Sequence, residues 1–243
     1  MVAAGRVLVR GSRALKPATA VLPEDPVLLA RADSDDDYAS RGGRKLAGAL
    51  DAWGAAGPGV AGRRCLDAGA STGGFTDVLL RRGATSVFAV DVGYGQLAWS
   101  LRSDPRVVVL DRTNVRGLTP AELGGPVTLV VADLSFISLT LVLPALRRCA
   151  QQDADLVLLV KPQFEVGRTR LGPGGVVRDP QLRAEAVTSV ATAAAAADLG
   201  VAGVTASPLP GPAGNVEYFL WLRSDAPPLA EGAVHRAVAA GPR

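Results

Sequence analysis

The sequence predicts an α/β fold in which a mostly parallel β-sheet is covered by helices on both faces and closed at one edge by an antiparallel hairpin. From residue 63 onward, short apolar runs alternate regularly with segments of helical periodicity. The apolar runs are hydrophobic at nearly every position, which is typical of parallel strands buried on both faces. The last two runs, near 201–207 and 216–222, have no helical segment between them and therefore predict the hairpin.

Length and composition narrow the class of protein. The 243 residues suffice for roughly one to two domains, and 48% hydrophobic with 20% charged residues indicates a soluble globular chain. The net charge of +3 permits a nucleic-acid partner without demonstrating one. The N-terminus has no basic-then-apolar signal pattern, and no apolar run reaches the length of a membrane span. The two cysteines give neither a disulfide framework nor zinc spacing, so we expect a cytoplasmic protein.

Three segments are expected along the chain. Residues 1–32 contain short strands around 6–10 and 27–30 with several basic side chains, and an acidic linker follows at Asp33–Asp37. Residues 38–223 form the α/β domain, and residues 224–243, rich in Gly, Pro and Ala, are expected to be a disordered tail.

Within the α/β domain, hydrophobic periodicity gives the order of elements. We expect the following elements: a helix from about residue 41 to Trp53, strand 63–67, helix 74–82, strands 86–91, 106–110 and 127–132, helix 139–150, strand 156–160, a long loop to Asp179, and helix 180–199. Loops of that length within compact domains are usually functional.

The turn after the first of these strands indicates a ligand site. Residues 65–80 run from an apolar strand through Asp67 and a glycine-rich turn into a helix, and open α/β sheets bind ligands at such strand ends. Ser71 stands where the dinucleotide fingerprint requires a glycine, and Asp67 would repel a phosphate. A carboxylate suits a cationic ligand, such as the amino group and sulfonium of S-adenosylmethionine. Asp91 ends the next strand, 22 residues after Gly69, and is placed to accept hydrogen bonds from ribose hydroxyls.

Charged residues gather at the same end of the predicted sheet. Asp133 and Lys161 directly follow two central strands, Glu217 lies in the last strand, and Lys45 lies on the helix before the first strand. The only histidine, His235, lies in the tail, which excludes a Ser-His-Asp triad or a His-ligated metal, and we expect no metal. All but three of the 26 basic residues are arginines, and lysine, unlike arginine, can lose its proton in a protein site.

Five stretches together resemble the haemolysin-A-type (TlyA) ribosomal RNA methyltransferases: residues 40–46, 67–75, 133–138, 161–165 and 215–218. These proteins belong to the ribose 2′-O-methyltransferases with a Lys-Asp-Lys-Glu tetrad. The resemblance covers about residues 38–223 and implies the Rossmann-like, seven-strand SAM-dependent methyltransferase fold. It also implies S-adenosylmethionine as the cofactor and a cytidine 2′-hydroxyl in ribosomal RNA as the acceptor. By this resemblance the catalytic residues are Lys45, Asp133, Lys161 and Glu217.

The resemblance also implies which residues bind the cofactor and the RNA. Those expected to bind S-adenosylmethionine are Asp67, Gly69, Ala70, Ser71, Thr72, Gly73, Gly74, Phe75, Asp91, Val92, Asn114 and Asp133. The first segment is similar to the second half of an S4 RNA-binding domain, and we expect the chain to carry only that half. The residues expected to contact RNA phosphates are Arg6, Arg10, Arg13, Lys16, Arg41 and Arg44.

The chemistry of the tetrad leaves one alternative open. A ribose hydroxyl is a very weak acid, and Lys161 is the best candidate to contact it, with Asp133 holding the lysine and the Lys45–Glu217 pair positioning the ribose. Nearby carboxylates favour a charged lysine, whereas burial favours the neutral form that a base requires. The alternative to proton removal by a neutral lysine is that positioning of the reactants and exclusion of water supply the rate.

Three rival functions are weighed against this one. A nicotinamide-dependent oxidoreductase is disfavoured because Ser71 replaces the fingerprint glycine. A membrane-active protein, as the historical family name suggests, is disfavoured because no spanning or strongly amphipathic basic segment occurs. A non-catalytic RNA-binding protein predicts a broken tetrad, and here the tetrad is complete.

Overall fold

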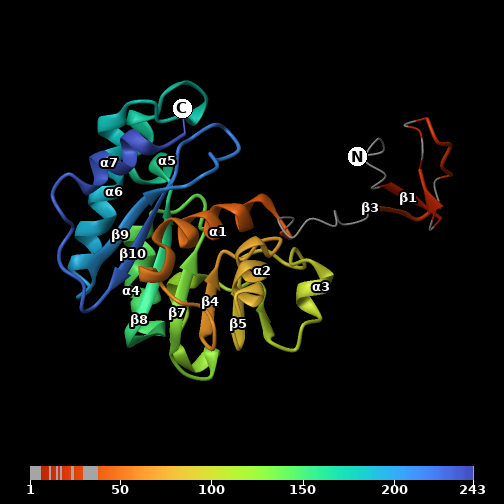
Figure 1. Cartoon of the computed structure of the whole chain (residues 1–243), viewed down its shortest axis with the longest axis horizontal. Coiled ribbons are helices and arrows are strands. Elements are labelled where there is room, and N and C mark those ends of the chain that lie inside the picture. The colour runs from red at the N-terminus through yellow and green to blue at the C-terminus, as the bar shows by residue number, and fades with distance from the viewer. Residues whose placement is uncertain are drawn as a thin grey trace. The chain divides into compact units, whose positions relative to one another are not determined.

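A computed structural model describes residues 7–10, 12–14, 16, 18–22, 25–29 and 38–242. The chain divides into two compact units, Met1–Asp37 and Tyr38–Arg243 (Figure 1). The acidic linker predicted at 33–37 lies outside the described residues.

The first unit contains a small antiparallel sheet. Strand β1 (Val7–Val9) lies between β2 (Ser12–Arg13) and β3 (Val27–Leu29). The strands predicted around 6–10 and 27–30 are therefore present, and β2 is an additional one. The similarity of this unit to an S4 domain stays a prediction.

The second unit is built on a seven-stranded sheet. Its strands are β4 (Arg64–Ala68), β5 (Ser86–Val90), β6 (Val107–Leu110), β7 (Val127–Ala132), β8 (Ala150–Val160), β9 (Gly200–Ala206) and β10 (Tyr218–Arg223). They are arranged in the order β6-β5-β4-β7-β8-β10-β9. Strand β10 pairs antiparallel with both β8 and β9, and the other pairs are parallel, which confirms the predicted fold class.

Helices cover both faces of this sheet (Figure 1). They are α1 (Arg41–Trp53), α2 (Gly74–Arg81), α3 (Trp99–Arg102), α4 (Leu139–Cys149), α5 (Pro162–Glu165), α6 (Pro180–Ala195) and α7 (Ala233–Ala240). Side-chain caps fix where two of the long helices begin: the Ser40 hydroxyl accepts from the Gly42 amide, and the Asp179 carboxylate accepts from the Gln181 amide.

Alternation along each strand divides the core into two layers. Leu66, Val130 and Leu158 pack in the layer that contains α4, α6 and α7. Their neighbours on the opposite face pack in the layer that contains α1 and α2, as Cys65 and Val131 show. Because both faces are buried, the strands need apolar side chains at every position, which is the pattern that the sequence shows.

The expectation of a disordered tail over 224–243 is wrong, because residues 233–240 form α7. Val234 and Ala237 are buried in the core layer of α6 and β9, and Val238 packs against it. These residues lie on one helical face, but their stripe is short and the surrounding Gly, Pro and Ala obscure its periodicity. The helix contacts α6 and β9, the edge strand of the sheet.

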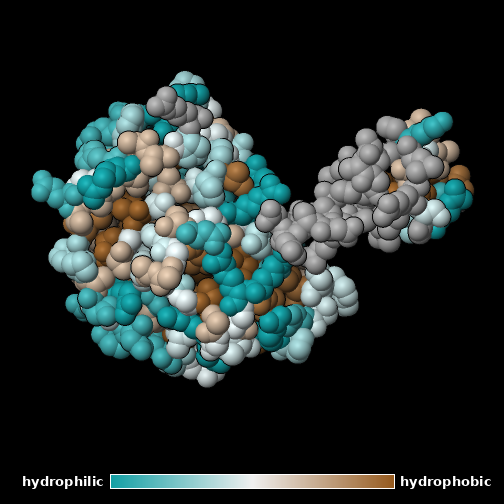
Figure 2. Space-filling view, in the orientation of Figure 1, coloured by the Kyte–Doolittle hydropathy of each residue, from teal (hydrophilic) through white to brown (hydrophobic). Residues whose placement is uncertain are grey.

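Two other segments differ from the expectation. The loop predicted between Lys161 and Asp179 contains the short helix α5 and two 3₁₀ turns, and β8 begins six residues earlier than predicted, at Ala150 rather than Leu156. On the face of the second unit shown in Figure 2, hydrophobic residues form separate patches among hydrophilic ones. Within the described residues, no helix is long and apolar enough to cross a membrane.

Candidate active site

Two adjoining cavities lie where the central parallel strands end. The first has a volume of about 430 Å³ and the second of about 290 Å³. Gly69, Ser71, Asp133 and Ser135 line both of them, so the cavities meet at the ends of β4 and β7. In the strand order these two strands separate the β5–β6 side from the β8–β10–β9 side, which is where open α/β sheets bind ligands.

The turn after β4 requires its glycines. Gly69 has a φ of 87°, and a Cβ atom there would lie 2.5 Å from the backbone oxygen of Asp133. Gly73 has a φ of 98°, and its Cβ would lie 2.3 Å from Leu101 Cδ1 and 2.8 Å from Leu97 Cδ1. The left-handed backbone and the close neighbours both exclude larger residues at these two positions. Because the glycines have no side chains, the backbone of the turn can lie at the cavity wall.

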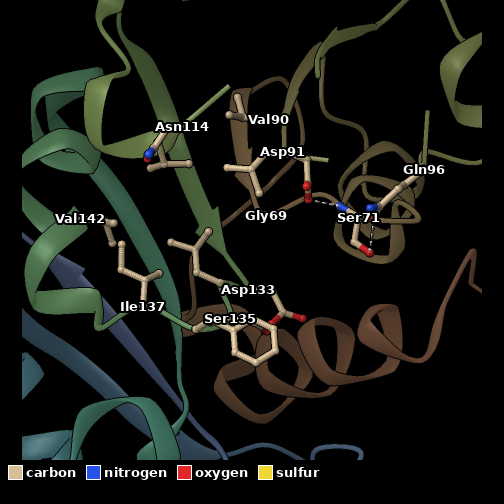
Figure 3. A pocket seen from close by; sticks show the side chains of 14 residues that line it. Gly69, Ser71, Val90, Asp91, Gln96, Asn114, Asp133, Ser135, Ile137 and Val142 are labelled. Carbon is tan, nitrogen blue, oxygen red and sulfur yellow. Dashed lines mark hydrogen bonds between the residues drawn. The ribbon is translucent and has the colours of Figure 1, made fainter. Parts of the chain in front are cut away.

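The first cavity combines apolar walls with carboxylates (Figure 3). Asp91 lies beside Ser71 on one side of it, and Asn114, Ile137 and Val142 lie on the other. The Asp91 carboxylate accepts from the Ser71 amide at 2.8 Å and from the Gly93 amide at 2.7 Å, which fixes its orientation. No lysine or arginine is among the described residues that line this cavity. Its size and composition suit a cationic nucleoside ligand with an apolar ring.

Asp67 lies behind the turn and does not line either cavity. It is fully buried, and its Oδ2 accepts a hydrogen bond from Thr76 Oγ1 on α2 at 2.6 Å. Burial raises the pKa of Asp67 to about 7, the Thr76 hydrogen bond opposes the rise, and the Asp133 and Asp91 carboxylates add to it. Gly73 likewise lies outside both linings, so these two residues shape the turn.

The second cavity contains Lys161, with its ammonium held by two partners. Lys161 Nζ lies 2.7 Å from Asp133 Oδ1 and donates to Ser135 Oγ at 2.8 Å. Lys161 directly follows β8 and Asp133 directly follows β7, and these strands are parallel neighbours, so these two residues meet at the strand ends.

Lys45, which also lines the second cavity, forms an ion pair with Glu217. Lys45 Nζ donates to Glu217 Oε2 at 2.6 Å, and the two side chains are only 6% and 1% exposed. Glu217 directly precedes β10 rather than lying within it. The backbone of Gly211 approaches this carboxylate so closely that a Cβ there would lie 2.6 Å from Glu217 Oε1. A buried pair of this kind is costly to break, because either partner alone is an uncompensated charge.

The other expected cofactor-binding residues are divided between the two cavities. Val92 lines the first cavity, as Asp91 and Asn114 do. The expected residues that line only the second cavity are Ala70, Thr72, Gly74 and Phe75. The turn after β4 therefore forms the partition between the cavities.

The structure describes the side chains of some, but not all, of the expected RNA-binding residues. Arg41 lines the second cavity, and Arg44 is exposed on α1. In the first unit, Lys16 is exposed, and Arg10 is exposed with its Nε 3.5 Å from Asp25. Arg6 and the side chain of Arg13 lie outside the described residues.

Two residues within the motifs were not singled out from the sequence. Ser135 lies two positions after Asp133 and binds Lys161. Glu165 accepts from Ser138 Oγ at 2.5 Å and from the Leu139 amide at 2.9 Å, so it joins the loop after β7 to α5. Desolvation raises the pKa of Glu165, and these two hydrogen bonds oppose the rise. Only their position inside the quoted motifs 133–138 and 161–165 could have pointed to them.

Comparison with known proteins identifies the family. A family model described as FtsJ-like methyltransferase matches residues 38–224. The 16S/23S rRNA (cytidine-2′-O)-methyltransferase TlyA of Mycobacterium tuberculosis is 63% identical over 247 residues, covering 100% of this chain and 91% of the relative. The 23S rRNA (cytidine-2′-O)-methyltransferase TlyA of Campylobacter jejuni is 33% identical, covering 85% and 80%.

Two solved structures are similar to this chain. One, described as a hemolysin from Streptococcus thermophilus, has a TM-score of 0.80 at 37% identity and covers 98% of this chain and 86% of that chain. A magnesium protoporphyrin IX methyltransferase from Synechocystis PCC 6803 with bound SAH has a TM-score of 0.53 at 17% identity, covering 75% and 84%, and shows the fold alone.

The methyl donor of these enzymes is S-adenosylmethionine, and the acidic, partly apolar first cavity fits it. The resemblance seen in the sequence motifs is therefore confirmed over the whole chain. The chain belongs to the FtsJ-like methyltransferase family and, within it, to the TlyA-type rRNA methyltransferases.

Proposed function

We propose that this protein transfers a methyl group from S-adenosylmethionine to the 2′-hydroxyl of a cytidine in ribosomal RNA. The observation that carries the proposal is the junction of the two cavities at Asp133 and Ser135. The first cavity is lined by carboxylates and apolar side chains, and the second by Arg41, Lys45 and Lys161. A cationic donor and a polyanionic acceptor would thus each meet a wall of opposite charge, and the relatives' names give cytidine as the nucleoside.

The first cavity would hold the donor. Asp91 would accept hydrogen bonds from its ribose hydroxyls, and Val115, Ile137 and Val142 would form apolar walls for the adenine. The backbone at Gly69 would lie against the methionine part. When bound, S-adenosylmethionine supplies a methyl group on a positively charged sulfur, which becomes a neutral thioether once the methyl is transferred.

Lys161 would act on the acceptor. In its neutral form its nitrogen can take the proton from the ribose hydroxyl while that oxygen bonds to the methyl carbon. Asp133 holds Lys161 at 2.7 Å and stabilises the ammonium that forms. Lys45 forms another part of the wall, and the buried Lys45–Glu217 pair would position the ribose.

Arginines near the site would hold the RNA backbone. Arg41 lines the second cavity, and Arg44 lies one helical turn further along α1. Arg10 and Lys16 of the first unit would add phosphate contacts. With ribosomal RNA as the acceptor, the reaction would take place in the cytoplasm.

The test is methyl transfer from isotopically labelled S-adenosylmethionine to unmodified ribosomal subunits, followed by mapping of the methylated nucleotides. We expect label at cytidine 2′-oxygens, with the same S-adenosylmethionine affinity in the presence and absence of a chelator. Label on a base, or on protein, would contradict the proposed acceptor.

A further inference from the structure

The ammonium of Lys161 is held at two points, one of which is the Ser135 hydroxyl. Lys161 Nζ lies 2.7 Å from Asp133 Oδ1 and 2.8 Å from Ser135 Oγ, and the lysine is 8% exposed. A lysine head at the end of four rotatable bonds can pivot about a single partner. A second partner removes that freedom.

The number of partners of Lys161 Nζ also determines which position on this nitrogen remains for the acceptor hydroxyl. A neutral primary amine has two N–H groups and one lone pair. Ser135 Oγ accepts one N–H group, and Asp133 Oδ1 lies 2.7 Å from the same nitrogen as its ion-pair partner. If the other N–H group turns to this carboxylate, the lone pair is the one position left on the nitrogen. Because Lys161 lines the second cavity, that position is available to a hydroxyl bound there. Without Ser135, the second N–H could compete with the lone pair for the same hydroxyl.

The loop that carries Ser135 is anchored at both ends independently of Lys161. The loop that carries it leaves β7 at Ala132 and ends at the cap of α4, where Glu165 accepts from Ser138 Oγ and the Leu139 amide. Between these ends Phe136 adopts a φ of 64°, which is uncommon for a bulky side chain. A backbone held in such a conformation at both ends can present a hydroxyl in a fixed position.

The position of Ser135 between the cavities agrees with this role. It is one of four residues that line both cavities, and Figure 3 shows it beside Asp133 at the wall of the first. The methyl group must pass from the donor to the acceptor oxygen near this boundary. A nitrogen displaced here would misplace the reacting hydroxyl.

We infer that Ser135 is a positioning residue that, together with Asp133, fixes Lys161 Nζ so that its lone pair faces the ribose hydroxyl. The inference rests on the proposed function, because it assigns Lys161 the proton. It distinguishes Ser135 from a residue that only shapes the donor cavity. The distinction can be measured, because donor binding and methyl transfer are separate readouts.

The experiment compares Ser135→Ala, Ser135→Thr and the control Ser189→Ala, which changes an exposed serine on α6. Single-turnover methyl transfer at saturating rRNA and S-adenosylmethionine is measured beside calorimetric affinity for the donor. We expect Ser135→Ala to lose about ten- to a hundredfold in rate, as for removal of a hydrogen bond to a charged group, while its affinity for the donor changes less than about twofold. Ser135→Thr keeps the hydroxyl and should recover most of the rate.

Three results would overturn the inference. The first is a methyl-transfer rate of Ser135→Ala within about twofold of that of the unchanged protein. The second is a loss of rate in Ser135→Ala that is matched by an equal loss of donor affinity. The third is a Ser135→Thr variant that is as slow as Ser135→Ala although its donor affinity is intact. The unchanged protein and Ser189→Ala test the proposed function separately. If neither methylates rRNA, both the proposed function and the inference that depends on it are wrong.

Discussion

The two lysines of the site differ in their surroundings. Lys161 contacts a carboxylate and a hydroxyl, and its side chain is 10% exposed. Lys45 has Glu217 as its ion-pair partner, and both side chains are buried. A group that exchanges a proton with a substrate needs a free position on its nitrogen, whereas a group that only positions the ribose can act through its charge.

The first prediction separates these roles. Lys161→Arg keeps the positive charge but cannot lose a proton near neutral pH, and its planar head is larger. We expect it to lose at least about a hundredfold in methyl transfer, the lower range for general base catalysis, while it still binds S-adenosylmethionine. Lys45→Arg should keep measurable activity. Single-turnover assays at saturating rRNA give both rates.

Equal losses in the two variants would show that the roles are wrongly divided. Retained activity in Lys161→Arg would exclude Lys161 as the base and leave positioning as the main source of rate. Calorimetry with S-adenosylmethionine on each variant shows whether a loss of activity reflects a damaged donor cavity.

The second prediction concerns Asp67, whose burial raises its pKa from 3.8 to about 7. At pH values between 3.8 and about 7, Asp67 is ionised in the unfolded chain but still protonated in the folded chain. The stability that Asp67 contributes should therefore decrease as the pH rises from about 4, and the loss is complete above about 7. In Asp67→Asn this part of the pH dependence should disappear. Thermal unfolding from pH 4 to 8 measures it, with Asp51→Asn on the exposed face of α1 as the control.

A parallel dependence on pH in the unchanged protein and Asp67→Asn would contradict the raised pKa. Asn can still accept the hydrogen bond of Thr76, so the variant keeps the contact that orients this side chain.

At the scale of elements, the turn between β4 and α2 determines whether a cavity forms at all. Gly73 takes a left-handed conformation at the cap of α2, and the side chains of Leu97 and Leu101 occupy the space that a side chain would need. The need for glycine therefore comes from the segment after β5 packing on the turn, rather than from the donor itself.

The third prediction is that Gly73→Val abolishes binding of S-adenosylmethionine and lowers the melting temperature. A branched side chain is strained at a φ of 98° and would displace Leu101. Gly59→Ala is the matched control, since Gly59 is exposed and a Cβ there meets nothing within 4 Å. Calorimetry and thermal unfolding give the two readouts. Unchanged donor binding in Gly73→Val would mean that the turn tolerates a different backbone.

The fourth prediction concerns α7, which packs on α6 and β9. Val234 is 4% exposed in this interface. Val234→Asp places an unpaired polar group there and should destabilise the protein by about 1–3 kcal/mol. Ala239→Asp, on the exposed side of the same helix, should have little effect. Chemical denaturation measures both variants, and equal stabilities would show that α7 contributes nothing to the fold.

At the scale of the whole molecule, exposed basic side chains occur on both units, and the second cavity of the catalytic unit is lined by three basic residues. Arg10 and Lys16 are exposed on the first unit, and Arg41 and Arg44 on the second. Phosphate contacts of this kind add affinity without reading sequence, and they weaken as salt displaces them.

The fifth prediction uses the full chain with both Arg10→Glu and Lys16→Glu. Affinity for rRNA should decrease, and the slope of log affinity against log salt should become shallower by about one for each phosphate that the variant no longer binds. Donor affinity should stay unchanged. Arg10→Lys with Lys16→Arg keeps both charges and should retain the slope. Identical salt slopes for the two double variants would show that these residues do not contact RNA.

Much of this protein can be predicted from the sequence, because the information is local. Apolar runs that end in Asp67, Asp91, Asp133 and Lys161 predict parallel strands and the edge where their ends meet. The fold, its antiparallel hairpin and the family follow from such patterns, and the structure and the comparisons confirm them.

Tertiary structure decided what depends on packing between distant segments. It joined Lys161 to Ser135, and it divided the residues of one turn between two cavities. It also directed Asp67 away from the cavities, because alternation along β4 aims that side chain at α2. Helix α7 forms because α6 and β9 bury its short apolar stripe. Sequence specifies which side chains reach the end of a strand, but the neighbouring elements determine which of them face solvent, ligand or one another.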